Sequence, residues 1–309
     1  MADWPQLDSG RDGPTFATLH LASQMLGKIR VAHAPWTNHG WHVTLRPNAA
    51  GLATLPTATG DGRTFTLALD LCRHGIALRV SDGTQELLAF DGQSIADMHA
   101  ALIAMLDRNR LPSTFHGRPN EIPDALPFAE DKAPRAYEPD NASRLLDALS
   151  RIVPVFERFR AGFTGKASPV HFFWGSFDLA VTRFSGREAP KHPGGIPNLP
   201  DRITREAYSH EESSAGFWPG GASAPPGVEP LFYSYAYPEP PGFRESAGED
   251  LQGAIFDATL GEYVLSYEHV RDSPAPERAL LMFMRSTYNR AANLAEWDRA
   301  ALEREPVAP

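Results

Sequence analysis

The amino-acid sequence predicts an α+β fold made of two related halves, each an antiparallel sheet with helices packed on one face. Candidate strands occur in runs joined by turns, whereas a doubly wound parallel sheet alternates single strands with helices. Both halves of the 309-residue chain also show the same order of a helix, several strands and a helix. Sequence identity between the halves is negligible, so this pseudo-repeat is inferred from the order of elements alone.

The N-terminal half is predicted to begin with a helix over 15–33, because apolar side chains from Phe16 to Ile29 recur on one helical face. Apolar and polar residues alternate over 64–72, and the alternation resumes at Ile76 after a turn, which is typical of a β-hairpin. The other elements predicted in this half are strands at 38–46 and 85–90 and a helix at 94–110.

The C-terminal half is predicted to repeat this order. A helix over 141–161 carries an apolar stripe, and Pro154 inside it predicts a kink or a break. The chain is predicted to end in a long helix over about 277–303. The strands predicted between these two helices lie at 169–174, 176–184, 231–237, 253–259 and 262–267.

Proline is unusually frequent, at 28 of 309 residues, against a usual ~5%. Proline is disfavoured in helix interiors and central strands, so the two proline-rich regions, 116–140 and 190–241, are predicted to be mostly loop. We therefore expect an N-terminal α+β half over 1–115, a proline-rich linker over 116–140 and a C-terminal α+β half over 141–309. The candidate site is expected in the C-terminal half, because long ordered loops are often functional.

The charge balance is acidic, with 29 Lys and Arg against 38 Asp and Glu and a formal net charge of −9. A general nucleic-acid-binding protein normally presents a basic face, so no nucleic-acid partner is expected. No uncharged apolar stretch approaches the ~18 residues of a membrane helix, and the N-terminus lacks the apolar core of a signal peptide. Cys72 is the single cysteine, which excludes an intramolecular disulfide and a thiolate-rich metal site. We expect a cytoplasmic protein without a membrane partner, and its oligomeric state stays open.

Several segments carry a resemblance to a known family. The longest is SPVHFFWGSFDLAVTRFSGR at 168–187, and others are REAYSHE at 205–211, GFWPGG at 216–221 and FYSYAYPEP at 232–240. Over essentially its whole length the chain resembles a bacterial family catalogued as domain of unknown function 5996. The resemblance implies a full-length member of that family, and it implies no reaction, cofactor or catalytic residue.

Common nucleotide-binding and hydrolytic motifs are absent from the sequence. No Gly-x-Gly-x-x-Gly dinucleotide fingerprint occurs, and the segment from Gly162 to Lys166 is too short for a phosphate-binding loop. The segment that begins His210-Glu211 resembles the start of a zinc-protease motif, but Ser214 stands where the second histidine would be.

Histidines are candidates for chemistry, since the chain has eleven of them. His171 lies in the apolar segment VHFFW, and His210 lies beside two glutamates. Imidazole and carboxylate groups are the usual ligands of iron, zinc and manganese, and an imidazole can also act as a general base. The alternative is that these are core or surface histidines satisfied by hydrogen bonds. The set that would hold a divalent metal ion (Fe, Zn or Mn) is His171, His210, Glu212 and His269.

Two charged residues share the predicted strand 176–184 but point in opposite directions. Asp178 alternates with Thr182 on one face, whereas Arg183 lies among apolar neighbours on the other. A buried arginine needs a carboxylate partner or a ligand anion, so Arg183 is either part of a structural ion pair or an anion clamp. Glu211, in the loop predicted over 205–221, is a candidate for orienting a histidine base.

Aromatic residues form a second candidate feature. Tyr233, Tyr235 and Tyr237 share one strand face by their period-2 spacing, and Trp174 and Trp218 lie in neighbouring segments. Such a set forms either the wall of a small-molecule pocket or part of the core with hydroxyls that reach solvent.

Two functions are consistent with these residues. The first is an enzyme acting on a small polar or anionic molecule, through histidine or carboxylate general-base chemistry or through a bound divalent metal. The second is a non-catalytic module that binds a small ligand or a protein. The catalytic candidates are His171, His210, Glu211 and Asp178. The ligand-binding candidates are Arg183, Trp174, Trp218, Tyr233 and Tyr235.

Overall fold

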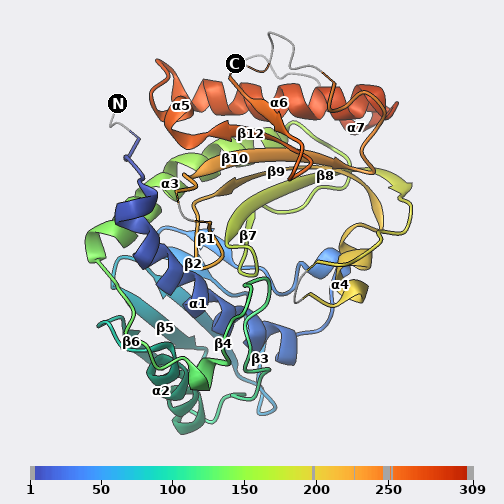
Figure 1. The fold of residues 1–309 in the computed structure, drawn as a ribbon. Helices are drawn as coiled ribbons and strands as arrows, with labels where there is room; N and C mark the ends of the chain where they lie inside the picture. The colour runs from blue at the N-terminus through green and yellow to red at the C-terminus, as the bar shows by residue number, and fades with distance from the viewer. Residues whose placement is uncertain (1–3, 197–198, 226, 246–250, 252, 305–309) are drawn as a thin grey trace.

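The computed structural model describes residues 4–196, 199–225, 227–245, 251 and 253–304. Within these ranges the chain has two antiparallel sheets of six strands each and seven α-helices, which confirms the predicted α+β class (Figure 1). The first sheet comes from the N-terminal half and the second from the C-terminal half. None of the helices in the described ranges combines the length and apolar character needed to cross a membrane.

The first sheet has the strand order β1-β2-β4-β5-β6, with β3 paired to β4. The predicted hairpin is present, since β4 and β5 pair antiparallel with Leu69 opposite Ile76. Alternate side chains of β4 are buried in the core beneath α1, as the alternation in the sequence predicted. The elements of this half are α1 (Ser9–His33), β1 (Arg46–Asn48), β2 (Gly51–Ala53), β3 (Thr57–Ala58), β4 (Thr64–Asp70), β5 (Gly75–Val80), β6 (Gln85–Ala89) and α2 (Ile95–Arg108).

The second sheet has the order β11-β12-β10-β9-β8-β7. In Figure 1, α6 runs along one face of this sheet and α4 lies on the side of the other face. The strands are β7 (His171–Phe173), β8 (Asp178–Glu188), β9 (His210–Trp218), β10 (Leu231–Tyr237), β11 (Ile255–Asp257) and β12 (Glu262–Ser266). The helices are α3 (Pro139–Ala161), α4 (Asp201–Ala207), α5 (Tyr267–Arg271), α6 (Pro276–Leu294) and α7 (Arg299–Leu302).

The two sheets meet where Leu45 pairs with Phe172. The backbone N–H of each donates to the carbonyl of the other, at 2.9 Å and 2.8 Å. One continuous buried apolar cluster extends through both halves, and Ile122 and Phe128 of the segment predicted as a linker belong to it. The segment predicted as a linker therefore contributes to the core, and the division of the chain into an N-terminal half, a linker and a C-terminal half stays a prediction.

The strand predicted over 38–46 is wrong for most of its length. Asn38–Gly40 forms a 3₁₀ helix, η1, and strand β1 begins only at Arg46. His39 and Gly40 have φ values of 58° and 70°, a left-handed backbone that cannot continue an extended strand. The turn that results packs Trp41 against Phe184 of the second sheet, with ring centres 5.9 Å apart.

The loop predicted over 205–221 is also wrong, because it contains the end of α4 and the strand β9. β9 lies inside the second sheet, paired with β8 on one side and β10 on the other. The prolines of this region flank the strand, and Pro219 follows it directly. The alternation was hidden because Glu212 and Ser214, which are both buried, are polar.

Two helix predictions need smaller corrections. α3 continues as one helix across Pro154, so no break occurs there, and its buried side chains Ile152 and Phe156 pack on both sides of the proline. The predicted helix over 277–303 is two helices, since α6 ends at Leu294. Glu296 has a φ of 51°, which ends the helical path before α7 begins.

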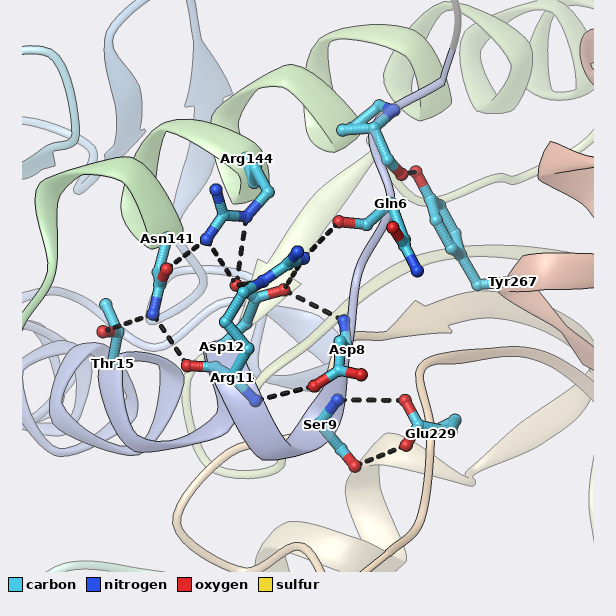
Figure 2. A network of polar contacts seen from close by, with 11 residues as sticks. Gln6, Asp8, Ser9, Arg11, Asp12, Thr15, Asn141, Arg144, Glu229 and Tyr267 are labelled. Atoms are coloured by element: carbon cyan, nitrogen blue, oxygen red, sulfur yellow. Dashed lines mark hydrogen bonds and ion pairs between the residues drawn. The ribbon is translucent and has the colours of Figure 1, made fainter.

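A polar network ties the N-terminus of α1 to α3 and to the segment before β10 (Figure 2). The fully buried carboxylate of Asp12 accepts hydrogen bonds from Arg11 at 2.9 Å and from Arg144 at 2.9 Å. Burial alone would raise the pKa of Asp12, but these donors and a backbone N–H offset it and lower the pKa. The Ser9 N–H donates to Glu229 at 2.9 Å, which fixes the other side of the helix start.

Candidate functional site

A cavity of about 1090 Å³ lies against the face of the second sheet that is opposite α3 and α6. The strand alternation produces this face: Asp178 and Thr182 of β8 line the cavity, while Leu179 between them is buried in the core. The remaining walls come from α1, the turn at η1, the segment around residue 120 and α4. Aromatic side chains that line the cavity include Trp36, Trp41, Trp174, Trp218, Tyr233 and Tyr235.

Asp178 is buried at the start of β8, with a donor on each carboxylate oxygen. The Ser176 hydroxyl donates to Oδ1 and the Tyr233 hydroxyl donates to Oδ2. Tyr233 belongs to β10 and reaches Asp178 across Gly216 of β9, where a Cβ would lie 2.1 Å from Cζ of the tyrosine ring. Burial raises the pKa of Asp178, and the two hydroxyl donors act against this rise.

Glu212 of β9 is buried and faces the same cavity. Its Oε1 accepts a hydrogen bond of 3.4 Å from the Tyr235 hydroxyl, which accepts one of 3.2 Å from the Tyr208 hydroxyl. Burial raises the pKa of Glu212 to about 8, although the Tyr235 hydroxyl and the charge of Lys166 act in the opposite direction. Glu212 is therefore protonated at neutral pH and able to donate a proton.

Two further carboxyl groups, Glu121 and Glu262, line the cavity within electrostatic reach of Asp178. Burial raises the pKa of Glu121 to about 7, and the charge of Asp178 adds to the shift. Burial likewise raises the pKa of Glu262 to about 8, with contributions from Asp178 and Asp257. The cavity thus concentrates acidic groups that disfavour one another's ionised forms.

Gln24 of α1 fixes the segment that carries Glu121. Its Oε1 accepts from the Asn120 N–H at 2.9 Å, and its Nε2 donates to the Asn120 carbonyl at 2.9 Å and to the Trp174 carbonyl at 3.2 Å. Glu121 then lies against Gly175, where a Cβ would be 2.0 Å from its Oε1. One side chain of α1 therefore joins this segment to the turn between β7 and β8.

Lys28, one helical turn after Gln24, is a buried lysine that lines the cavity. Its Nζ donates to Oδ1 of Asn120 at 2.6 Å and lies 5.8 Å from the centre of a Trp174 ring. Burial lowers the pKa of Lys28 to about 8, so part of its population is neutral near physiological pH.

His39 meets Lys166 at the side of the cavity formed by η1. The Nδ1 of His39 lies 2.8 Å from the carbonyl of Ala207, so this nitrogen carries the proton and donates it. Nε2 is then the acceptor for Lys166 Nζ at 2.5 Å. Burial lowers the pKa of both His39 and Lys166.

The structure places His171, one of the four catalytic candidates, outside the cavity lining. It is fully buried beside Trp41 and Phe173, with ring centres 6.4 Å and 4.6 Å away, and its Nδ1 lies 3.1 Å from the Thr44 hydroxyl. Burial, with the charge of Arg46 added, holds the pKa of His171 well below its ordinary value. His171 is a neutral core side chain in this arrangement.

Glu211 does not pair with a histidine as expected, because its carboxylate contacts Ser185 and Arg187 instead. Glu211 accepts hydrogen bonds from Ser185 at 2.9 Å and from Arg187 at 2.8 Å, and it is not among the residues that line the cavity. His210, next to it, lies near His39, with ring centres 5.8 Å apart. The neighbouring Glu212 faces the cavity instead.

Arg183 lies on the helix side of β8 and does not line the cavity. Its guanidinium lies over the rings of Phe159 and Tyr288, at 3.6 Å and 4.3 Å, and donates to the Phe159 carbonyl. Burial lowers the pKa of Arg183 to about 10. Within the described ranges no carboxylate forms an ion pair with it, so stacking on aromatic rings takes the place of both predicted partners.

The predicted metal ligands are not brought together. In the described ranges, no group of three His, Cys, Asp or Glu side chains is arranged to hold a metal ion. The four predicted ligands are dispersed: His171 is in β7, His210 and Glu212 are in β9, and His269 is in α5.

The structure does bring together Asp178 and four of the predicted ligand-binding residues, which all line the cavity: Trp174, Trp218, Tyr233 and Tyr235. Sequence reasoning missed Glu121, Glu262 and Trp41. Glu262 and Val264 share one face of a short strand, with the buried Tyr263 on the other face, and this spacing could have indicated a carboxyl group on the same face as Val264. Glu121 had no such signal, because it lies in irregular structure and has a left-handed φ of 58°.

Comparison with known proteins identifies a family but no activity. No curated protein matches the chain significantly, and no solved structure does. The model of the family of unknown function DUF5996 matches residues 4–304. The chain therefore belongs to the DUF5996 family.

Proposed function

We propose that this protein is an enzyme that converts a small organic molecule by general acid–base catalysis with carboxyl groups. One observation carries the proposal: Asp178 and Glu212 face the same cavity from adjacent strands, in unlike surroundings. In enzymes, an acid–base pair typically consists of two carboxyl groups whose surroundings give them different pKa values.

Asp178 is the base in this proposal. Hydroxyl donors from Ser176 and Tyr233 favour its ionised form, which can accept a proton from a substrate in the cavity. The same two donors fix the orientation of the carboxylate, so that it need not reorganise when the substrate arrives.

Glu212 is the acid. Its pKa of about 8 keeps it protonated at neutral pH, and the chain of hydroxyls from Tyr208 and Tyr235 holds it in place. A protonated carboxyl group in an apolar wall can give its proton to a leaving group or to a developing oxyanion. The roles expected for His171 and His210 thus pass to two carboxyl groups.

Non-catalytic binding of a small ligand is the second candidate function. The observation that favours it is the number of tryptophans on the cavity wall: Trp36, Trp41, Trp174 and Trp218. Aromatic walls with few polar groups are typical of binding sites in general, whether or not a reaction follows.

Both candidates can be tested by incubating the protein with a protein-free extract of bacterial small molecules and following each compound by mass spectrometry. The variants are Asp178→Asn and Glu212→Gln, with Glu211→Gln as the matched control, since Glu211 lies next to Glu212 but outside the cavity. We expect the wild type and Glu211→Gln to consume a compound and form a product. Each cavity variant should be slower by a factor of about 10²–10⁴, the usual contribution of a general acid or base.

Two results would overturn the enzyme proposal. If a compound is retained by the wild type but recovered unchanged, the protein is a binding module. If a compound is consumed at the same rate by the wild type and by both cavity variants, catalysis does not depend on Asp178 and Glu212.

A further inference from the structure

Three carboxyl groups line the cavity, and Asp178 lies within electrostatic reach of both Glu121 and Glu262. The charge of Asp178 raises the pKa of each of the other two. Asp178 has two hydroxyl donors, whereas Glu121 and Glu262 make no side-chain hydrogen bond to any other described residue. Their oxygens are thus left for solvent or a ligand.

No positive charge of the described chain balances these groups. Among the described residues, none of the three carboxylates forms an ion pair within 4.0 Å. Lys28 lines the cavity, but its Nζ donates its hydrogen bond to Asn120. Burial lowers the pKa of Lys28, and no carboxylate acts to raise it again. Arg202 at the rim is exposed.

The walls next to these carboxyl groups are aromatic. Tyr233, which donates to Asp178, stacks with Tyr235 at a ring-centre distance of 6.2 Å, and Trp218 lies close by through its hydrogen bond to the Ser176 carbonyl at 3.2 Å. The faces of such rings attract cations, most strongly in desolvated sites. A bound cation favours the ionised form of carboxyl groups beside it, so Glu121 and Glu262 lose their protons more readily when an ammonium group is present. Such carboxyl groups, together with aromatic rings, recognise an ammonium ion.

From this arrangement we propose that the ligand of the cavity is an organic cation, an apolar molecule bearing an ammonium group that binds beside Asp178, Glu121 and Glu262. The inference rests on the proposed function, since it assigns a substrate class to the same cavity. It also replaces the anionic molecule expected from Arg183, which lies on the opposite side of the sheet.

The test compares cations with neutral molecules of the same size and shape. Calorimetric titration is carried out with choline against 3,3-dimethylbutan-1-ol and with 2-phenylethylamine against 2-phenylethanol. In the wild type we expect the cation of at least one pair to bind about tenfold more tightly than its neutral counterpart, which corresponds to about 1.4 kcal/mol. The double variant Glu121→Gln, Glu262→Gln should lose this preference, whereas Glu211→Gln should keep it.

The outcomes separate this inference from the proposed function. If the neutral members bind as tightly as the cations, or if the double variant keeps the preference, the cation inference is overturned while acid–base catalysis on a neutral molecule still stands. If neither pair binds, the inference is overturned as well, and consumption of another compound in the extract assay then decides the proposed function independently. A thermal unfolding curve for each variant verifies that it is folded before titration.

Discussion

The hydroxyl of Tyr233 donates a hydrogen bond to the carboxylate of Asp178, although the two residues lie on strands separated by β9. The contact exists because Gly216 of β9 has no side chain beneath the tyrosine ring. The Tyr233 side chain can therefore extend across β9 and hold the Asp178 carboxylate on β8. The position of the proposed base thus depends on Gly216, which makes no polar contact with it.

Gly216→Ala tests this dependence. The new Cβ would lie 2.1 Å from Cζ of Tyr233, so the ring must move and the hydrogen bond to Asp178 must break. We expect loss of most ligand binding or turnover, with the fold retained. Gly13→Ala is the control, because a Cβ at that position of α1 meets nothing within 4 Å. Equal activity of the two variants would show that the Tyr233 position does not matter.

Tyr233→Phe removes the hydroxyl and leaves the ring. The Tyr233 hydroxyl opposes the rise in the pKa of Asp178 that burial causes, so this pKa should rise further in the variant. The acidic limb of the pH–rate profile, which reports the ionisation of the base, should then move to higher pH. Tyr237→Phe is the control, since its hydroxyl donates to the Pro190 carbonyl at 2.8 Å. An unchanged acidic limb in Tyr233→Phe would contradict the role of Asp178.

The raised pKa of Glu212 should make the stability of the protein depend on pH. Its pKa is about 8 in the folded chain against an ordinary 4.5, so between these values the native state holds a proton that the unfolded state has lost. Its contribution to stability is therefore full below pH 4.5 and is lost as the pH rises towards 8, by at most about 1.4 kcal/mol per pH unit. In Glu212→Gln this loss should be absent.

The measurement for Glu212 is the free energy of unfolding in urea at several pH values from 5 to 8. As the pH rises, the free energy of unfolding of the wild type should fall relative to that of Glu212→Gln. Glu211→Gln, which changes the neighbouring carboxyl group outside the cavity, serves as the control. Parallel curves for the wild type and Glu212→Gln would mean that Glu212 ionises normally in the folded chain.

His171 illustrates what the sequence could and could not predict. The apolar alternation around it predicted a buried strand, and β7 is one; the same burial removes the imidazole from the cavity. The tyrosine strand was predicted with its observed bounds because period-2 spacing depends on neighbouring residues only. By contrast, the partnership of Asp178 with Glu121 and Glu262 joins segments distant in the sequence, and no local pattern encodes it.

Polar strand faces set a second limit to sequence-based prediction. β9 was missed because an inward-facing Glu212 and Ser214 look like surface residues in the sequence, whereas they face an internal cavity. The left-handed backbone at His39 similarly depends on its contacts, such as the hydrogen bond to the Ala207 carbonyl. The strand β9 and the turn at His39, where local rules fail, both contribute to the cavity wall, which is a general tendency of functional sites.

His171→Ala is expected to lower the melting temperature without changing ligand affinity or the pH–rate profile. The imidazole is fully buried against Trp41 and Phe173, so its removal leaves a hole in the core. Thermal unfolding and ligand titration of the same preparation separate the two effects. A loss of binding with an unchanged melting temperature would restore His171 to the site.

The contribution of Asp12 to stability should depend on pH in the opposite direction from that of Glu212. Its pKa lies below the ordinary 3.8, because donors that include Arg11 and Arg144 outweigh the effect of burial. Its stabilising contribution is therefore present above pH 3.8 and is lost as the pH falls through its lowered pKa.

Asp12→Asn leaves Arg144 without its charged partner, and we expect it to cost about 2 kcal/mol at neutral pH. Asp8→Asn, which keeps a good N-cap residue, should cost much less. Urea unfolding from neutral to acidic pH should show the wild type and Asp12→Asn converging in acid, and a constant difference between them would place the stabilisation in packing instead of charge.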